Sequence, residues 1–169
     1  MRRMKNRLRE GNRRYLQNSD PSLRIDTAEN GQHPYAIVIC RSDSRVIPEQ
    51  IFDAGIGDLF VIRVAGNVLD QHQLGSVEYA VDHLHCKRVL LLGHTGCGAI
   101  GAALGDEENT GYVASITKCI RAAVGTEGDP YRACRLNVEF GVDTLRRLFA
   151  DAEIRGAIYD IRSGEVEWL

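Results

Sequence analysis

Three short apolar runs rich in β-branched residues constrain the fold of this 169-residue chain more than any other feature. They are Tyr35–Cys40, Asp58–Val64 and Arg88–Gly93. Continuous apolar runs of this length are typical of strands buried on both faces, as in a parallel sheet. Between the second and third runs, Gln73–Leu84 has apolar residues at the spacing of one helix face. The alternation predicts an α/β fold, with a mostly parallel central β-sheet, flanking helices and right-handed crossovers.

The second half of the chain is expected to be mostly helical. The predicted helices are Ile100–Leu104, Val113–Val124 and Tyr131–Ala150. A short hairpin then closes the chain, with strands at Gly156–Arg162 and Glu165–Leu169 around a Ser-Gly turn. No repeat, low-complexity segment or linker interrupts the sequence, so we expect a single domain over residues 1–169.

Residues 1–17 are expected to form a basic amphipathic helix. Met4, Leu8 and Tyr15 lie near helical spacing, and cationic side chains surround them. These cations are Arg2, Arg3, Lys5, Arg7, Arg9, Arg13 and Arg14. A solvated face or a subunit contact is the favoured interpretation, and a nucleic-acid or membrane-surface role is the alternative.

The net charge, the apolar runs and the cysteines indicate which kinds of partner and which cellular compartment to expect. The net charge of −2 argues against a nucleic-acid-binding protein, and no apolar run approaches the roughly 20 residues that span a bilayer. No apolar segment of a secretory signal follows the basic N-terminus. Five cysteines without a repeated spacing favour a reducing compartment over a disulfide framework. We therefore expect a cytoplasmic protein.

Polar and metal-binding residue types follow two of the predicted strands. The first strand leads into Cys40–Arg45, and the third leads into Gly93–Gly98. Ligands of α/β proteins collect where such strands end. His94 and Cys97, three residues apart, are both ordinary zinc ligands. Taken alone, the His-x-x-Cys spacing fits a packed core equally well.

Longer segments of the sequence are more specific than the His-x-x-Cys spacing alone. Ser42–Val68 (SDSRVIPEQIFDAGIGDLFVIRVAGNV) and Leu90–Leu104 (LLLGHTGCGAIGAAL) resemble the β-class carbonic anhydrase family. LREGNRRYL near the start and GAIYDIRSGEVEWL at the end are also similar to it. The resemblance implies the β-carbonic anhydrase fold in obligate homodimers or dimers of dimers, with the N-terminal helix lying across the partner. It also implies zinc held by Cys, His and Cys, which activates water to attack carbon dioxide.

Six positions match functional residues of that family: Gln32, Asp43, Arg45, His94, Cys97 and Gly98. The resemblance implies that Asp43 and Arg45 form a pair that orients the water or acts as a gate. It implies that Gln32 bonds substrate across the dimer interface and that the Gly98 amide helps to bind bicarbonate. His94 and Cys97 match two of the three zinc ligands.

The third zinc-ligand position is Arg41, two residues before Asp43 and nine after Gln32. Arginine stays protonated and would repel a zinc ion several ångströms away by several kcal/mol. Cys40 lies one residue early, and adjacent residues of a strand point to opposite faces. Cys40 could therefore bind metal only if a bulge re-aimed it. We expect no zinc and no other cofactor.

These residues leave three functional hypotheses. The favoured one is a pocket repurposed for a small anion (bicarbonate, phosphate or a phosphate ester), held by Arg41, Arg45 and the backbone amides near Gly98. His94 or Cys97 could then act as base or nucleophile in hydrolytic chemistry. The alternatives are a working carbonic anhydrase, with zinc held irregularly through Cys40 or with a metal-free route, and a catalytically silent scaffold. Asp43 could pair with Arg45, or with Arg41, which would partly close the site.

Overall fold

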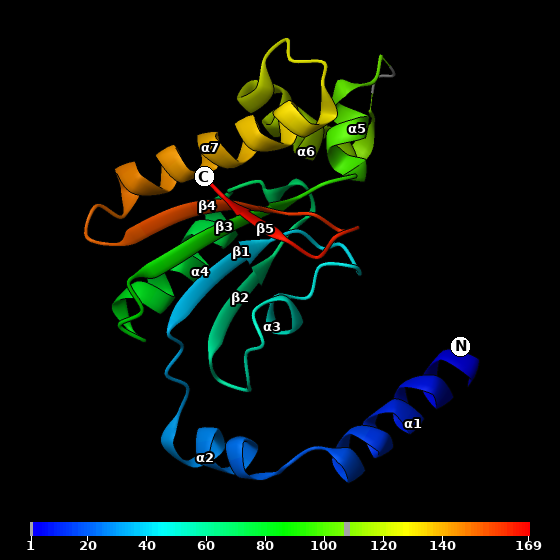
Figure 1. Ribbon diagram of the computed structural model, residues 1–169, viewed down its shortest axis with the longest axis vertical. Helices are drawn as coiled ribbons and strands as arrows, with labels where there is room; N and C mark the ends of the chain where they lie inside the picture. Colours follow the sequence, from blue (N-terminus) through cyan, green and yellow to red (C-terminus); the bar gives the residue numbers. More distant parts are fainter. Residues whose placement is uncertain (1, 107–108) are drawn as a thin grey trace. The chain divides into compact units, whose positions relative to one another are not determined.

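The computed structural model describes residues 2–106 and 109–169 (Figure 1). The chain forms two compact units, Met1–Gln32 and His33–Leu169, and each has its own organisation. The prediction of a single domain over residues 1–169 stays a prediction. Residue 1 of the predicted N-terminal helix lies outside the described residues.

The first unit consists of helices α1 (Arg2–Asn18) and α2 (Ser22–Asn30). The amphipathic pattern correctly predicts α1, and its apolar residues Met4, Leu8 and Tyr15 are exposed. Helix α2 was not predicted from the sequence, because it has no apolar face and no buried residue. Local bonds support it instead, including one from the Ser22 amide to the Asp20 carboxylate at 2.9 Å. No described residue of this unit is buried, so the unit has no apolar core of its own.

The second unit is built on a five-stranded sheet in the order β2-β1-β3-β4-β5. Its strands are β1 (Ala36–Cys40), β2 (Leu59–Arg63), β3 (Arg88–His94), β4 (Glu153–Tyr159) and β5 (Val166–Trp168). The first four pair with one another in parallel, and β5 pairs with β4 in antiparallel fashion. The predicted α/β fold with a mostly parallel sheet is confirmed. The first hairpin strand begins earlier than predicted and pairs along all of β3, so it belongs to the central sheet.

The predicted helices of the second unit are present, with ends shifted by a few residues. They are α4 (Gln71–Asp82), α5 (Gly98–Leu104), α6 (Gly111–Val124) and α7 (Pro130–Leu148). Two shorter elements, α3 (Pro48–Ile51) and the 3₁₀ turn η1 (Ala65–Asn67), were not predicted. An Asp70 capping box starts α4, and Asp129 caps α7 ahead of a proline.

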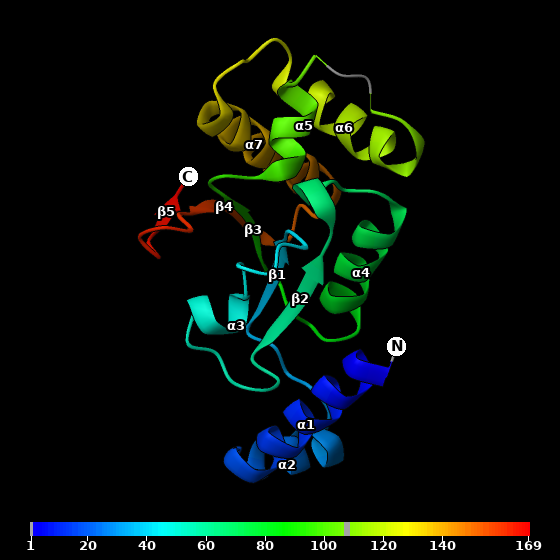
Figure 2. The same cartoon turned by 90° about the vertical axis from the view of Figure 1, so that its right-hand side faces the viewer.

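The two faces of the sheet are covered unequally (Figure 2). Ile37 and Ile39 of β1 face a core that includes buried residues of α4 and α7. Val38 and Cys40 point to the opposite face, where the chain after α3 contributes Phe52. Neighbouring side chains of a strand point to opposite faces of the sheet. Cys40 therefore lies on the face opposite to Ile39.

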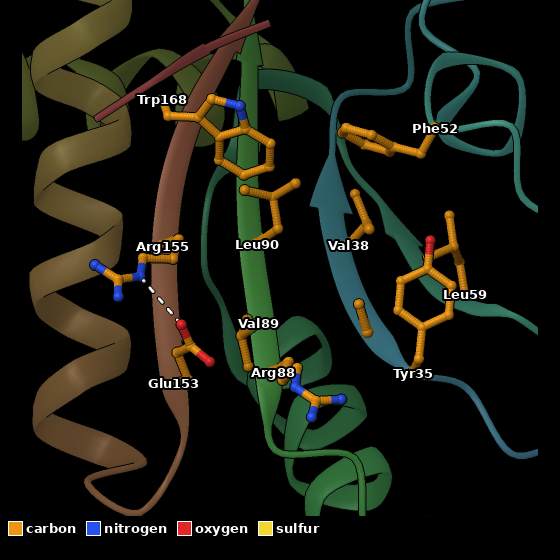
Figure 3. Close-up of a pocket in the computed structure, with 11 residues that line it drawn as sticks. Tyr35, Val38, Phe52, Leu59, Arg88, Val89, Leu90, Glu153, Arg155 and Trp168 are labelled. Atoms are coloured by element: carbon orange, nitrogen blue, oxygen red, sulfur yellow. Dashed lines mark hydrogen bonds and ion pairs between the residues drawn. The ribbon is translucent and has the colours of Figure 1, made fainter.

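An apolar cleft of about 350 Å³ lies over the less covered face, at the amino-terminal part of β1 and β3 (Figure 3). Val38, Leu90, Phe52 and Trp168 line it, and the ion pair between Arg155 and Glu153 lies at its margin. Within residues 2–106 and 109–169, no helix is long and apolar enough to cross a membrane. All five cysteines are free thiols.

Candidate active site at the ends of two strands

The carboxyl ends of β1 and β3 meet because the two strands are parallel neighbours. The loops that follow them therefore lie at one edge of the sheet. Arg41 follows β1, and its Nη1 donates a hydrogen bond to the Sγ of Cys97, which follows β3. Arg45 Nη2 donates to the carbonyl oxygen of Gly96 at 3.4 Å. Two segments that are distant in the sequence thus form one cluster.

The guanidinium of Arg41 is almost fully enclosed, with 2% of the residue exposed. Its Nη1 bonds to Cys97, whereas its Nε and Nη2 have no hydrogen-bond partner. Unpaired donors of a buried cation are costly, because burial removes their hydrogen bonds to water. The family resemblance implies a zinc ligand at this position. In this chain a buried cation with two unused hydrogen-bond donors occupies it.

Asp43 pairs with Arg45, which decides between the two pairings left open by the sequence. Arg45 Nε and Nη2 hold the two Asp43 oxygens at 2.9 and 2.7 Å, and the Arg45 amide adds a third bond at 2.9 Å. The hydrogen bonds from the Arg45 side chain hold the pKa of Asp43 well below its usual range. Asp43 is thus a carboxylate already committed to Arg45, and no hydrogen bond joins it to Arg41 among those of the described residues.

His94 is the last residue of β3 and is 1% exposed. Its Nδ1 lies 2.8 Å from the carbonyl oxygen of Thr95, which can only accept a hydrogen bond. Nδ1 therefore carries a proton. Nε2 faces Asp43 Oδ2 at 3.5 Å and has no hydrogen-bond partner. The ring is thus oriented into the cluster, with Nε2 as its free nitrogen.

Cys97 is half-buried and precedes α5 as its N-cap residue. Burial alone would raise the pKa of its thiol, but the neighbouring His94 and the charge of Arg41 outweigh burial and lower the pKa. Cys134, on α7, is buried and close enough to interact electrostatically with Arg41 and Cys97. Burial raises the pKa of Cys134, and its Sγ donates to the His94 carbonyl oxygen at 3.2 Å.

Cys40 does not belong to the cluster of Arg41, His94 and Cys97. It is fully buried in an apolar cluster with Val38, Leu90 and Leu92. Burial raises the pKa of its thiol to about 11, so the side chain is a neutral thiol near pH 7. A metal ligand must be a thiolate, so this surrounding disfavours metal binding by Cys40.

The remaining predicted residues are Gln32 and Gly98. Gln32 is exposed and belongs to the first unit, so its predicted contact with substrate across a dimer interface stays a prediction. Gly98 is exposed and begins α5 next to Cys97. Apart from its chain neighbours and the backbone of its own helix, no atom lies within 4 Å of the place that a Gly98 side chain would take, so other groups leave that place open.

Arg63, at the end of β2, holds the loop that carries Arg41. Its Nε donates to the Arg41 carbonyl oxygen at 3.3 Å. Its Nη2 donates to the carbonyl oxygens of Asp43 at 2.6 Å and Val46 at 2.8 Å. Through these three bonds Arg63 supports the backbone of residues 41–46. Nothing in the sequence pattern linked Cys134 to the site, because only the packing of α7 brings it there.

Within residues 2–106 and 109–169, no group of three or more His, Cys, Asp or Glu side chains is arranged to hold a metal ion. His94 and Cys97 occupy the two positions at which the resemblance implies zinc ligands. Asp43 lies near His94 but is held by Arg45. The Arg41 guanidinium donates a hydrogen bond to Cys97.

Residues 36–166 match the family model described as carbonic anhydrase. Carbonic anhydrase 2 of Mycobacterium tuberculosis is 46% identical over 102 residues, which cover 57% of this chain and 49% of that protein. The match thus spans about half the length of this curated relative. Among solved structures, the β-carbonic anhydrase CafA of Aspergillus fumigatus superposes with a TM-score of 0.85 at 27% identity, covering 99% of this chain and 90% of CafA. A tetrameric β-carbonic anhydrase of Sordaria macrospora gives 0.80 at 28% identity, covering 98% and 94%.

Proposed function

The chain belongs to the β-class carbonic anhydrase family, and on that premise we propose that it is a zinc-free member whose active-site pocket binds a small oxyanion at Arg41. The carrying observation is the buried Arg41 guanidinium with two unused donors. Bicarbonate, phosphate and phosphate esters are the candidate ligands, because each presents adjacent anionic oxygens.

The donor set does not fit a zinc ion, which supports the first part of the proposal. Tight zinc sites have three or four protein ligands. Here the Cys97 sulfur accepts from Arg41, and Asp43 is held by Arg45. A guanidinium this close would repel the dication by several kcal/mol. Cys40, a neutral thiol in an apolar cluster, does not replace the missing ligand.

Arg45 illustrates what the unused donors of Arg41 can hold. Arg45 uses its Nε and Nη2 to bind both oxygens of the Asp43 carboxylate. The same two nitrogens of Arg41 have no partner. This fork matches two oxygens of one carboxylate or phosphate group, and such bidentate pairs are among the stronger hydrogen-bonded contacts in proteins. An oxyanion would satisfy both donors at once.

Charge supports an anion over a neutral ligand. A zinc dication and one thiolate together contribute a net charge of +1, and one arginine contributes the same. The substitution therefore keeps the positive charge of the pocket while removing the metal. With a phosphate ester as ligand, His94 and Cys97 lie at the same cluster and could act as base or nucleophile.

Elemental analysis and anion titration of the full chain test the proposal. We expect zinc far below one per chain, and a melting temperature that rises with bicarbonate or phosphate at constant ionic strength. Arg41→Met should abolish the rise. Arg155→Met is the matched control, because Arg155 pairs with Glu153 far along the sheet and should leave the rise intact. Melting temperatures that do not respond to any of these anions would contradict the anion site and favour a silent scaffold.

The second candidate function is carbonic anhydrase activity. The retained pair of Asp43 and Arg45, with His94 at 3.5 Å from Asp43, favours it. Equimolar zinc together with rapid hydration of carbon dioxide would establish it and overturn the zinc-free proposal. Hydration without metal would depend on general-base catalysis alone, which typically contributes about 10²–10⁴-fold.

We also propose that the chain works as a homodimer or a dimer of dimers in the cytoplasm. The exposed apolar residues of α1, namely Met4, Leu8 and Tyr15, support a subunit contact. The Sordaria macrospora relative is tetrameric. Five free thiols agree with a reducing compartment.

A further inference from the structure

We propose that Asn30 is a site of spontaneous modification, at which the Gly31 amide converts the asparagine to aspartate or isoaspartate and thereby loosens the end of α2 just before Gln32. Water is the co-reactant. The inference goes beyond anion binding at Arg41 and does not depend on it.

The two residues at the end of α2 are the first support. Asn30 is the one asparagine of the sequence that precedes a glycine, and both residues are exposed. Gly31 adopts φ 82° and ψ 178°, a backbone conformation that is essentially restricted to glycine. The fold therefore requires glycine at position 31. Glycine has no side chain that obstructs attack by its amide on the preceding side chain.

The Gly31 amide is the second support, because it is the attacking group. Among the hydrogen bonds between described residues, none is donated by this amide. The end of α1 differs in this respect. There the amide that follows Asn18 belongs to Ser19, and it donates to the Tyr15 carbonyl oxygen at 2.9 Å. The proton of the Gly31 amide is thus the one that solvent can remove, and its removal gives the nucleophile.

The third support is the weak hold on the last turn of α2. Ring closure requires the backbone at Asn30 to leave its helical conformation. Helix ends open at little cost in free energy where few buried contacts hold them. No residue of α2 is buried. The last turn can therefore open while the rest of the chain stays folded, which makes the reaction accessible to the native protein.

The reaction balances with water alone. The Gly31 nitrogen, after losing its proton to solvent, attacks the side-chain carbonyl carbon of Asn30. A bond forms between that carbon and the backbone nitrogen, the bond to Nδ2 breaks, and Nδ2 departs as ammonia with a proton from solvent. Water then opens the cyclic imide at either of its two carbonyl carbons, which gives aspartate or isoaspartate. No atom is oxidised or reduced.

The contact between Asn30 and Asp26 explains why the product loosens α2. Asn30 Nδ2 donates to Asp26 Oδ1 at 2.7 Å, one helical turn away. Conversion replaces this donor with a second carboxylate, and like charges four residues apart destabilise a helix. A negative charge at the carboxyl end of a helix is also unfavourable. The last turn of α2, which ends two residues before Gln32, therefore loses a bond and gains a repulsion.

The test compares two asparagines within one sample of the full chain, aged at neutral pH and analysed by peptide mass mapping. Trypsin releases Asn30 in the peptide 25–41 and Asn18 in the peptide 15–24. Asn18 is the matched control, because it is also the exposed last residue of a helix. We expect Asn30 to be converted at least about tenfold faster than Asn18, since glycine leaves the attack unobstructed.

Variants test the consequence for α2 by brief digestion of the folded chain. Asn30→Asp supplies the product carboxylate, and we expect trypsin to cleave after Arg24 about threefold faster than in the original chain. Cleavage after Arg13 of α1 is the reference in the same digest and should keep its rate. Asn30→Gln retains a side-chain amide without adding charge. It should therefore leave both cleavage rates near those of the original chain.

Each part of the proposal has an outcome that overturns it. Conversion of Asn30 no faster than that of Asn18 would reject the modification site. Equal cleavage after Arg24 in Asn30→Asp and in the original chain would reject the loosening of α2. The comparison of the two asparagines needs no variant, so it stays decisive even where a variant folds poorly. Zinc content and anion binding do not enter either measurement, so this proposal and the proposed function fail separately.

Discussion

Arg41 and Cys97 follow two adjacent parallel strands, and the guanidinium of the first donates a hydrogen bond to the sulfur of the second. The family resemblance implies a zinc ligand at each of these two positions. In this chain the two side chains contact each other. The contact leaves the pocket with a fixed positive charge and a cysteine whose neighbour is a cation.

The first prediction reverses the substitution. Arg41→Cys should restore the third ligand beside His94 and Cys97, and we expect bound zinc to rise to about one per chain. Hydration of carbon dioxide, followed by the acidification of a buffered indicator, should appear with it. Arg41→Ser is the control, since it removes the cation without supplying a thiolate, and its zinc content should stay low. A serine variant that binds zinc as well as the cysteine variant would show that loss of the cation alone is sufficient.

The second prediction concerns Arg63, which bonds to the carbonyl oxygens of Arg41, Asp43 and Val46. Arg63→Met leaves these acceptors without their donor, and we expect the free energy of unfolding to fall by about 1–3 kcal/mol. Urea unfolding measures the change. Arg155→Met removes one exposed ion pair and should cost less than about 1 kcal/mol. Equal losses in the two variants would contradict the role of Arg63 in holding the loop.

The third prediction is a pH dependence caused by Cys40. Burial raises the pKa of its thiol from 9.0 to about 11 in the folded chain. Between these values the unfolded chain releases a proton that the folded chain keeps, so the free energy of unfolding falls as pH rises. The slope from this one group is at most about 1.4 kcal/mol per pH unit. Its contribution is fully present below pH 9 and is lost as pH rises towards 11.

Cys40→Val tests this dependence, because valine suits the apolar cluster and has no proton to lose. The difference in unfolding free energy between the original chain and the variant should change between pH 8 and pH 11, in favour of the variant at high pH. A difference that stays constant over this range would contradict burial of a neutral Cys40. The zinc content of Cys40→Val should equal that of the original chain, because Cys40 is not a ligand.

The fourth prediction tests the close packing under His94. A side chain on Gly93 would come within 2.7 Å of Val138 and 3.2 Å of the Cys134 sulfur. Gly93→Ala should therefore reduce the free energy of unfolding by about 1–3 kcal/mol. Gly101→Ala is the matched control, because nothing lies within 4 Å of its added carbon. In the middle of α5 this substitution should be neutral or stabilising, by about 0.5–1 kcal/mol.

The fifth prediction concerns the assembly. Met4→Glu with Leu8→Glu should convert dimers to monomers in analytical ultracentrifugation, because it places charge on the apolar residues of α1. Asn6→Glu with Gln17→Glu makes the same change of charge on exposed polar residues and should leave the dimer intact. A monomeric original chain, or equal dissociation of both variants, would contradict a subunit contact through these residues.

Much of the fold could be predicted because buried strands and helix faces show in the sequence as apolar runs or as apolar residues at regular spacing. β1, β2 and β3 lie in apolar runs, and helices α1, α4 and α7 show apolar residues at helical spacing or clear capping residues. The helix α2 could not be predicted, because none of its residues is buried and no periodic face exists. The extent of β4 could not be predicted either, since its pairing along β3 is a long-range choice.

The sequence by itself predicted that Arg41 stands where the family resemblance implies a zinc ligand, and that Cys40 points away from that position. The first prediction rests on the resemblance together with the spacing of Arg41 to Gln32 and Asp43, and the second on the two-residue period of a strand. Both are local properties of a chain segment.

Only the tertiary structure decided which partners the charged groups take. It paired Asp43 with Arg45, hydrogen-bonded Arg41 to Cys97, and brought the Cys134 thiol of α7 to the carbonyl oxygen of His94. The physical reason is that hydrogen bonds between side chains depend on distances and directions within a few tenths of an ångström. Those are set when strands and helices pack, and no periodicity of the sequence encodes them.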